Sequence, residues 1–164
     1  MKKEINMDIL NKYLLMKPSI RGIIEWFLLF ISGGCGYFFP ILALPFRRYL
    51  LILGIALFVL GFIIHGISHK THRQAHSKAK DIEKIVTEGI YSKIRHPGYL
   101  GLILVYLGVA LWFGNILPVI LSIIFSVLLI LTALKEEEYL LRKFGKEYEE
   151  YMKRVPWRFI PKVF

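Results

Sequence analysis

Residues 97–134 read PGYLGLILVYLGVALWFGNILPVILSIIFSVLLILTAL and contain no charged side chain. A single helix of this length, rising about 1.5 Å per residue, would overshoot a hydrocarbon core about 30 Å thick. The run must therefore fold back on itself. The residues Phe113–Asn115 supply the turn, and Pro118 suits the first turn of a returning helix. This stretch predicts a helical hairpin embedded in a membrane.

Two further uncharged runs precede the hairpin, at Trp26–Phe46 and Tyr49–Ile67, and each is long enough to span. Three glycines and Pro40 interrupt the first run, which predicts a kink or a close helix contact. Arg47-Arg48 is expected to be a short connector between the two. Glu25 lies at the edge of the first run. It is interpreted as a snorkelling or interfacial acid, with a proton relay as the alternative.

The flanking segments are polar and basic. Residues 1–21 carry apolar side chains at near-helical spacing and predict a short interfacial helix ending near Pro18. Residues 81–88 read as a short amphipathic segment that Gly89 breaks. The apolar positions after residue 134 recur at helical spacing and predict an amphipathic C-terminal helix that Pro156 ends. These positions are Leu140, Phe144, Tyr148 and Tyr151.

Composition agrees with membrane embedding, since 55% of the 164 residues are hydrophobic. The net charge of +10 comes from positives placed between the apolar runs, so we expect membrane topology and anionic headgroups, and no nucleic-acid partner. The N-terminal segment, residues 68–96 and the C-terminal tail carry five, seven and eight Lys or Arg, whereas the Arg47-Arg48 connector carries two and the Gly114-Asn115 turn none. The chain is thus predicted to be an all-α integral membrane protein with about four transmembrane helices. Both termini, including a cytosolic amphipathic C-terminal helix, are expected on the cytoplasmic side.

The stretch before the hairpin, GIYSKIRHPGYLG at residues 89–101, concentrates ionisable and aromatic side chains. Pro97 is well placed as the first residue of a helix, whose free N–H groups would then lie beside Arg95 and His96. Such a helix N-terminus binds anions readily. The alternative is a snorkelling Arg and an interfacial His, and the residues alone leave both interpretations open.

Three acids, Glu136-Glu137-Glu138, follow the second leg of the hairpin. Because the hairpin returns this exit to the side where its first leg begins, the acids are expected to face Arg95 and His96. The alternative is a solvated charge run supported by i,i+4 pairs. Another ionisable group, Arg158, lies between aromatic residues in the tail. It could be an interface anchor or a fork for a carboxylate.

A third constellation is a set of histidines spaced by four, three and four residues, which places them on one face of a continuing helix. These are His65, His69, His72 and His76. Two His four apart can ligate a metal. No second cluster accompanies them, so an interfacial or cofactor-edge helix is the favoured interpretation and no metal site is predicted.

Together these signals resemble the isoprenylcysteine carboxyl methyltransferase and phospholipid methyltransferase superfamily. The first family signature reads here Gly89, Tyr91, Arg95, His96, Pro97, Tyr99 and Gly101. The block after the hairpin reads Glu136, Glu137, Leu140, Phe144, Gly145, Tyr148 and Tyr151, and the tail adds Pro156, Arg158 and Pro161. The resemblance covers about residues 85–161. The N-terminal half matches only in being apolar helices.

The resemblance implies an S-adenosylmethionine-dependent methyltransferase that acts by direct methyl transfer on a lipophilic acceptor, within a single membrane domain of residues 1–164. The segment 1–67 would hold an interfacial segment and two spans, and 68–164 the cofactor-binding catalytic half, with the active site on the cytoplasmic side. The cofactor-binding residues that it implies are Tyr91, His96, Pro97, Tyr99, Gly101, Glu136 and Glu137. The catalytic residues that it implies are Arg95, Glu137 and Arg158, with Arg95 or Arg158 orienting an anionic acceptor.

The chemistry of the acceptor stays open in the sequence. A carboxylate needs no base, whereas a phospholipid amine must lose a proton, to Glu137 or His96. A membrane reductase using NADPH is the alternative enzyme, because some carry a related Pro-x-Tyr-x-Gly motif. A small non-catalytic scaffold, in which Arg95, His96 and the acids merely pair, is the alternative without activity. The oligomeric state is not predicted.

Overall fold

The computed structural model describes residues 10–14, 16–72 and 82–163. These residues form helices, with short 3-10 turns and a single isolated bridge between Ala43 and Asn115. Residues 10–14 form one helical turn. The elements that follow are α2 (Pro18–Phe38), η1 (Pro40–Leu42), α3 (Arg47–Thr71), η3 (Gly89–Ser92), α4 (Pro97–Phe113), α5 (Ile116–Phe144) and α6 (Lys146–Arg154). The all-α prediction is confirmed.

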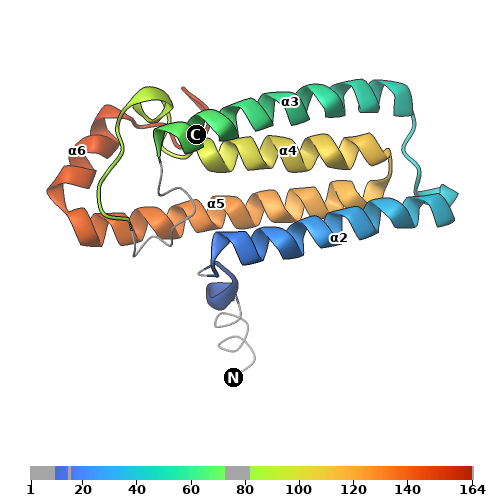
Figure 1. Cartoon of the computed structure of the whole chain (residues 1–164), viewed down its shortest axis with the longest axis horizontal. Helices are drawn as coiled ribbons and strands as arrows, with labels where there is room; N and C mark the ends of the chain where they lie inside the picture. The colour runs from blue at the N-terminus through green and yellow to red at the C-terminus, as the bar shows by residue number, and fades with distance from the viewer. Residues whose placement is uncertain (1–9, 15, 73–81, 164) are drawn as a thin grey trace.

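Four apolar helices lie side by side along the long axis of the molecule (Figure 1). Three of them, α2, α3 and α5, are long and apolar enough to cross a membrane, and α4 is a shorter apolar helix of 17 residues. In the order seen in Figure 1, α3 packs along α4, α4 packs on α5, and α2 packs on α5 and α4. Most of the large apolar side chains on the outer faces of α2 and α3 are exposed, as lipid-facing residues are.

The predicted hairpin is formed by α4 and α5. Gly114 ends α4 with a left-handed φ of 60°, a conformation that glycine adopts without a steric penalty. Asn115 then caps α5, because its side-chain oxygen accepts a hydrogen bond from the Leu117 N–H at 2.9 Å. Pro97 and Pro118 lie in the first turns of their helices, as the sequence predicts.

Three predicted boundaries are wrong in the N-terminal half. The first span begins at Pro18, because this proline occupies the first helical turn, so α2 includes Arg21 and Glu25. Arg47 and Arg48 form the first turn of α3, where arginine is a good helix former, and not a connector. In the described residues 82–88 no helix forms, and Gly89, with a φ of 58°, opens the turn η3.

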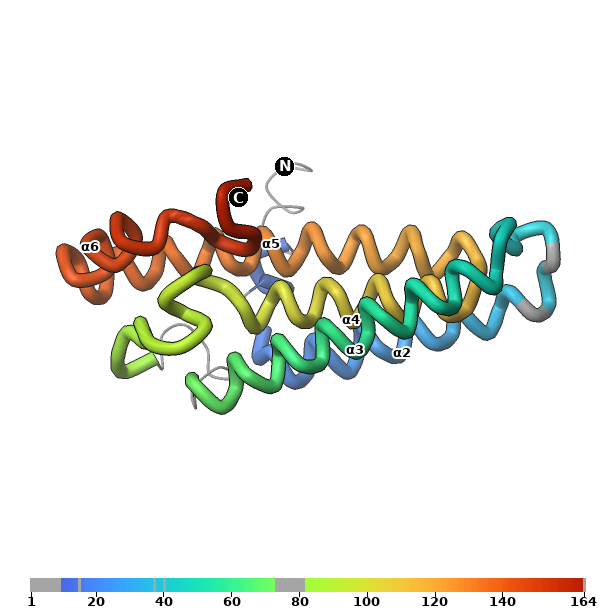
Figure 2. Tube along the Cα trace, turned by 90° about the horizontal axis from the view of Figure 1, so that it is seen from above, coloured from blue at the N-terminus to red at the C-terminus, as the bar shows by residue number. Residues whose placement is uncertain are grey.

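The charged C-terminal part also differs from the prediction. Helix α5 continues past residues 136–138 to Phe144, since Glu, Leu, Arg and Lys favour helix. Gly145, with a positive φ of 55°, then ends α5 and starts α6, so the predicted amphipathic helix is two helices. Tyr148 and Tyr151 on α6 pack with Leu140 and Ile82 in a small apolar cluster. The tail beyond α6 turns back alongside α5 toward the start of α4 (Figure 2).

Helices α3 and α4 meet along a glycine seam made of Gly54 and Gly61 on α3 and Gly101 and Gly108 on α4. Residues seven apart in a helix lie on nearly the same face. A Cβ built on Gly61 would lie 2.6 Å from the Gly101 carbonyl oxygen, and one on Gly108 would lie 2.6 Å from the Phe58 nitrogen. The two backbones are therefore in direct contact, as small residues allow in membrane helices.

A methyl group in this seam should separate the two helices. We expect Gly61→Ala to lower the free energy of unfolding by about 1–3 kcal/mol, because its Cβ would meet backbone atoms that cannot yield. Gly66→Ala on the same helix is the matched control, since nothing lies within 4 Å of its Cβ position. Thermal unfolding of the purified protein in detergent, followed by tryptophan fluorescence, measures both. Equal melting temperatures for the two variants would contradict the seam.

Candidate functional site

The C-terminal tail docks on the loop that precedes α4. The Arg95 N–H donates to the Trp157 carbonyl at 2.9 Å, and the His96 N–H donates to the Arg158 carbonyl at 2.9 Å. The Arg95 side chain also donates from Nη1 to the Val155 carbonyl at 2.7 Å. The two halves of the predicted motif are thus held together by the backbone as well as by side chains.

Glu137 on α5 is the centre of this docking. Its Oε1 accepts from Arg95 Nε at 2.7 Å and from His96 Nε2 at 3.0 Å, and its Oε2 accepts from Arg158 Nε at 2.9 Å. The residue is 4% exposed. The prediction that the acids face Arg95 and His96 is confirmed. The carboxylate therefore holds three segments together, and both of its oxygens already accept hydrogen bonds from the protein.

Removing this acid should release the tail. We expect Glu137→Gln to lower the free energy of unfolding by about 3–5 kcal/mol, because two arginines lose their buried counter-charge. Trypsin should then cleave the tail at Arg154 or Arg158 faster than in the wild type. Glu138→Gln is the control, since Glu138 is exposed and pairs with the exposed Lys135 at 3.1 Å. Unchanged cleavage and unchanged melting would show that Glu137 does not hold the tail.

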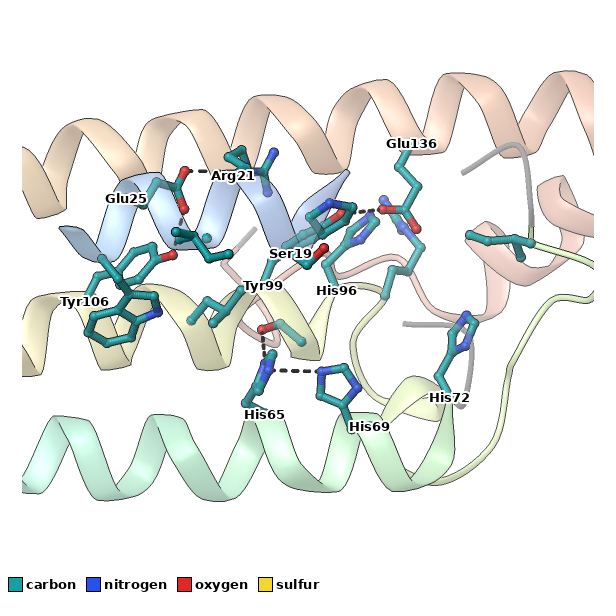
Figure 3. Close-up of a pocket in the computed structure, with 18 of the residues that line it drawn as sticks. Ser19, Arg21, Glu25, His65, His69, His72, His96, Tyr99, Tyr106 and Glu136 are labelled. Atoms are coloured by element: carbon teal, nitrogen blue, oxygen red, sulfur yellow. Dashed lines mark hydrogen bonds and ion pairs between the residues drawn. The ribbon is translucent and has the colours of Figure 1, made fainter. Parts of the chain in front are cut away.

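A cavity of about 520 Å³ opens beside this cluster, among α2, α3, α4 and the charged part of α5 (Figure 3). Five of the predicted site residues line it, namely Tyr91, Arg95, His96, Tyr99 and Glu136. The predicted residues that are not among its lining are Pro97, Gly101, Glu137 and Arg158. The sequence therefore locates the cavity but does not separate the side chains that face it from those that support it.

Each residue outside the lining has a structural position that accounts for it. Gly101 lies in the glycine seam, where a Cβ would be 2.7 Å from the His65 nitrogen, so it faces α3 and not the cavity. Pro97 is buried in the first turn of α4. Glu137 and Arg158 bind each other. Direct contact of these four with a ligand in the cavity is a prediction that the geometry disfavours.

Glu136 is the acid that does face the cavity. It lies one position before Glu137 on α5 and accepts a hydrogen bond from the Tyr99 hydroxyl at 2.8 Å. Within the described residues Glu136 forms no salt bridge, in contrast to its neighbours Glu137 and Glu138. The rings of Tyr99 and His96 lie 5.8 Å apart at 32°. The cavity thus contains an acid that has no cationic partner in the described part of the chain, next to two aromatic rings.

The sequence analysis missed a polar cluster on α2. Glu25 is 1% exposed and accepts hydrogen bonds from the hydroxyls of Tyr13 and Tyr106, both at 2.6 Å. Arg21 lies one turn earlier, with its Nε 3.5 Å from Glu25, and donates from Nη1 to Thr132 at 2.7 Å. The interpretation of Glu25 as a snorkelling acid is therefore wrong. The signal that could have revealed it is an i,i+4 pair of opposite charges followed by an apolar run.

The histidine face lines the cavity from α3 (Figure 3). His65 Nδ1 lies 3.1 Å from the Gly98 carbonyl oxygen, which can only accept, so Nδ1 carries the proton. His65 Nε2 is 3.0 Å from His69 Nε2. His72 packs on the ring of Tyr91, and His76 lies outside the described residues. The described residues contain no group of three or more metal-ligating side chains.

Burial alters the titration of two lining groups outside the spans. It lowers the pKa of His72, which favours the neutral imidazole. It also raises the pKa of Tyr91 to about 12, and the Tyr91 hydroxyl is 2.7 Å from the buried Ser68 hydroxyl. Both groups are therefore neutral hydrogen-bonding partners for a ligand at pH 7.

Comparison with known proteins matches the C-terminal part of the chain to a family. The model of the "Ergosterol biosynthesis ERG4/ERG24 family" matches residues 66–164, which is more than half of the chain. The chain belongs to this family. The matched region includes α4, α5 and the tail, so it contains Glu136, Glu137 and their partners. It excludes α2, with Arg21 and Glu25.

The individual relatives of this family member fall into two kinds. A Delta(14)-sterol reductase of Mus musculus, TM7SF2, is 35% identical over 83 residues, covering 49% of this chain and 20% of that protein. A protein-S-isoprenylcysteine O-methyltransferase of Schizosaccharomyces pombe is 37% identical over 87 residues, covering 52% of this chain and 36% of that protein.

A solved structure gives the same fold. The eukaryotic intramembrane Ras methyltransferase ICMT (isoprenylcysteine carboxyl methyltransferase) is 25% identical with a TM-score of 0.62, covering 88% of this chain and 52% of that one. The predicted kinship with the isoprenylcysteine carboxyl methyltransferase superfamily is confirmed. The chain spans about half or less of the length of these relatives.

Proposed function

We propose that the protein is an S-adenosylmethionine-dependent methyltransferase that transfers a methyl group directly to a lipophilic acceptor in the membrane. The likeness to the intramembrane methyltransferase structure over 88% of this chain supports this proposal, as does the O-methyltransferase of Schizosaccharomyces pombe. The apolar helices support a membrane location. We place the active site and both termini on the cytoplasmic side, where the positive-inside bias puts the basic segments.

The observation that carries the proposal is the charge on the cavity wall. Among the described lining residues the arginines are Arg21 and Arg95, and each already faces an acid, at 3.5 Å and 2.7 Å respectively. Glu136 faces the cavity without such a partner among the residues that the structure describes. S-adenosylmethionine carries a sulfonium and an ammonium group, so an uncompensated acid attracts it. A nicotinamide dinucleotide carries several phosphate charges and would be repelled.

The lining residues fit this cofactor in kind and in space. Cavities for small molecules occupy about 300–1,000 Å³, and this one of about 520 Å³ lies in that range. Glu136 and the Tyr99 hydroxyl would hold the ammonium group or the ribose hydroxyls. The first N–H groups of α4, near the lining residue Gly98, would hold the carboxylate. The rings of His96 and Tyr99 offer a face for the adenine.

Bound S-adenosylmethionine would supply an electrophilic methyl group to the acceptor. The protein's part would be to align the two ligands and to exclude water from the cavity. A carboxylate acceptor arrives ionised and requires no base. Glu137 is a poor base for an amine acceptor because its oxygens are engaged by Arg95, His96 and Arg158. Arg95 and Arg158 act as positioning residues through Glu137.

A second candidate function is reduction of a lipophilic substrate with NADPH. The family match at residues 66–164 and the mouse sterol reductase favour it. It requires the cavity to accept a polyanion, which the lining acid Glu136 opposes. A non-catalytic scaffold would bind neither cofactor.

Titration of the detergent-solubilised protein with S-adenosylhomocysteine and with NADPH distinguishes the methyltransferase, the reductase and the non-catalytic scaffold. We expect S-adenosylhomocysteine to bind and NADPH not to bind. Glu136→Gln should weaken S-adenosylhomocysteine binding by about tenfold or more, because a charge-assisted hydrogen bond to the ammonium is lost. Glu138→Gln, two positions along α5 and exposed, should leave binding unchanged. Binding of NADPH alone would favour the reductase, and binding of neither would reject both enzymes.

A further inference from the structure

We infer that Arg21 on α2 binds an anionic oxygen group of the methyl acceptor, which makes α2 the segment that selects the acceptor. This inference rests on the proposed function, because it places the cofactor in the same cavity as the acceptor. It concerns residues outside the family match at 66–164. The shared chemistry is an oxyanion on an apolar tail, whether a carboxylate or a lipid phosphate.

The hydrogen bonding of Arg21 is incomplete. The residue is 2% exposed, and a guanidinium has five N–H donors. In the described part of the chain, Nη1 donates to Thr132, and Nε is buried with no hydrogen-bond partner. The Nε lies 3.5 Å from Glu25, which is an ion pair and not an aligned hydrogen bond. A buried N–H group without an acceptor is costly, so Arg21 has an unmet need for a hydrogen-bond acceptor.

Glu25 does not supply that acceptor, because its contact with Nε at 3.5 Å is not a hydrogen bond. Its Oε1 accepts from the Tyr13 hydroxyl and its Oε2 from the Tyr106 hydroxyl, both at 2.6 Å. Glu25 therefore holds Arg21 in place by charge, while the two tyrosine hydroxyls donate hydrogen bonds to its oxygens. This leaves the guanidinium available to a second anion, despite its ion pair.

The position of Arg21 relative to the cavity supports a ligand role. Arg21 and Glu25 line the same cavity as Glu136, and Figure 3 shows them at separate places along it. Near the α2 pair the lining is apolar, with Ile23, Trp26 and Leu102. Nothing lies within 4 Å of the Cβ position of the lining residue Gly22. An apolar tail fits there beside the guanidinium, while the cofactor occupies the end with Glu136.

Direct binding measurements on the full chain in detergent test this inference without turnover. The probes are N-acetyl-S-farnesylcysteine, its methyl ester and lysophosphatidylethanolamine. The first two share one tail and differ in the carboxylate charge. We expect the wild type to prefer the carboxylate over the ester. Arg21→Gln should weaken carboxylate binding by about tenfold or more and change ester binding less than about twofold.

Glu25→Gln gives a result of opposite sign, and it tests the inference even if Arg21→Gln fails to fold. Removing the acid next to Arg21 should tighten carboxylate binding, because the anion no longer meets a like charge. Lys17→Gln, an exposed position at the start of α2, is the matched control and should have no effect. Preferential binding of lysophosphatidylethanolamine, dependent on Arg21, would identify the oxyanion as a lipid phosphate.

Two results would overturn the inference. One is equal affinity of the wild type for the carboxylate and the ester with no binding of the phospholipid. The other is equal loss of carboxylate and ester binding in Arg21→Gln, which indicates a structural tie only. S-adenosylhomocysteine is titrated in the same variants and should bind unchanged. Failure of the wild type to bind it would reject the proposed function, whereas intact binding without anion preference rejects this inference alone.

Discussion

The structure depends on the carboxylate of Glu137. A single buried acid accepts hydrogen bonds from Arg95, His96 and Arg158, and so joins the loop before α4, the continuation of α5 and the C-terminal tail. Each partner comes from a segment that the membrane does not order. A buried charge is tolerated only when it is fully paired, and here the pairing also fixes where the chain closes over the cavity. Without it, the described part of the tail would keep two backbone hydrogen bonds to the loop before α4 and the hydrogen bond from Arg95 to the Val155 carbonyl.

The two adjacent acids Glu136 and Glu137 have different roles in this arrangement. Glu137 points into the protein and accepts from three donors, whereas Glu136 points toward the cavity and meets only the Tyr99 hydroxyl among the described residues. A helix places consecutive side chains about 100° apart, so one pair of residues can serve both purposes. The cavity is then bounded on its other side by α2, whose own acid and arginine are held by tyrosines and Thr132. The charged residues around the cavity thus include one that holds the chain together, Glu137, and one that faces the cavity, Glu136.

The sequence predicts much of this, and its failures have physical causes. The hairpin, the position of Pro97 and the meeting of the acids with Arg95 and His96 follow from uncharged length and turn residues. The sequence does not predict which of Glu136 and Glu137 faces the protein interior, because neighbouring glutamates are equivalent until the tail docks. The cluster at Arg21 and Glu25 was missed because a charge at the edge of an apolar run normally snorkels. Its partners Tyr106 and Thr132 are far away in the chain. The break at Gly145 was hidden by a continuous apolar spacing.

The glycine seam has a consequence for how the protein can move. Because the backbones of α3 and α4 touch at Gly54, Gly61, Gly101 and Gly108, these two helices have little room to move against each other. The histidines of α3 and the first turn of α4 therefore keep a constant spacing. Helix α2 packs on the other side, against α5. We therefore expect a widening of the cavity to displace α2 or α5, and not to separate α3 from α4.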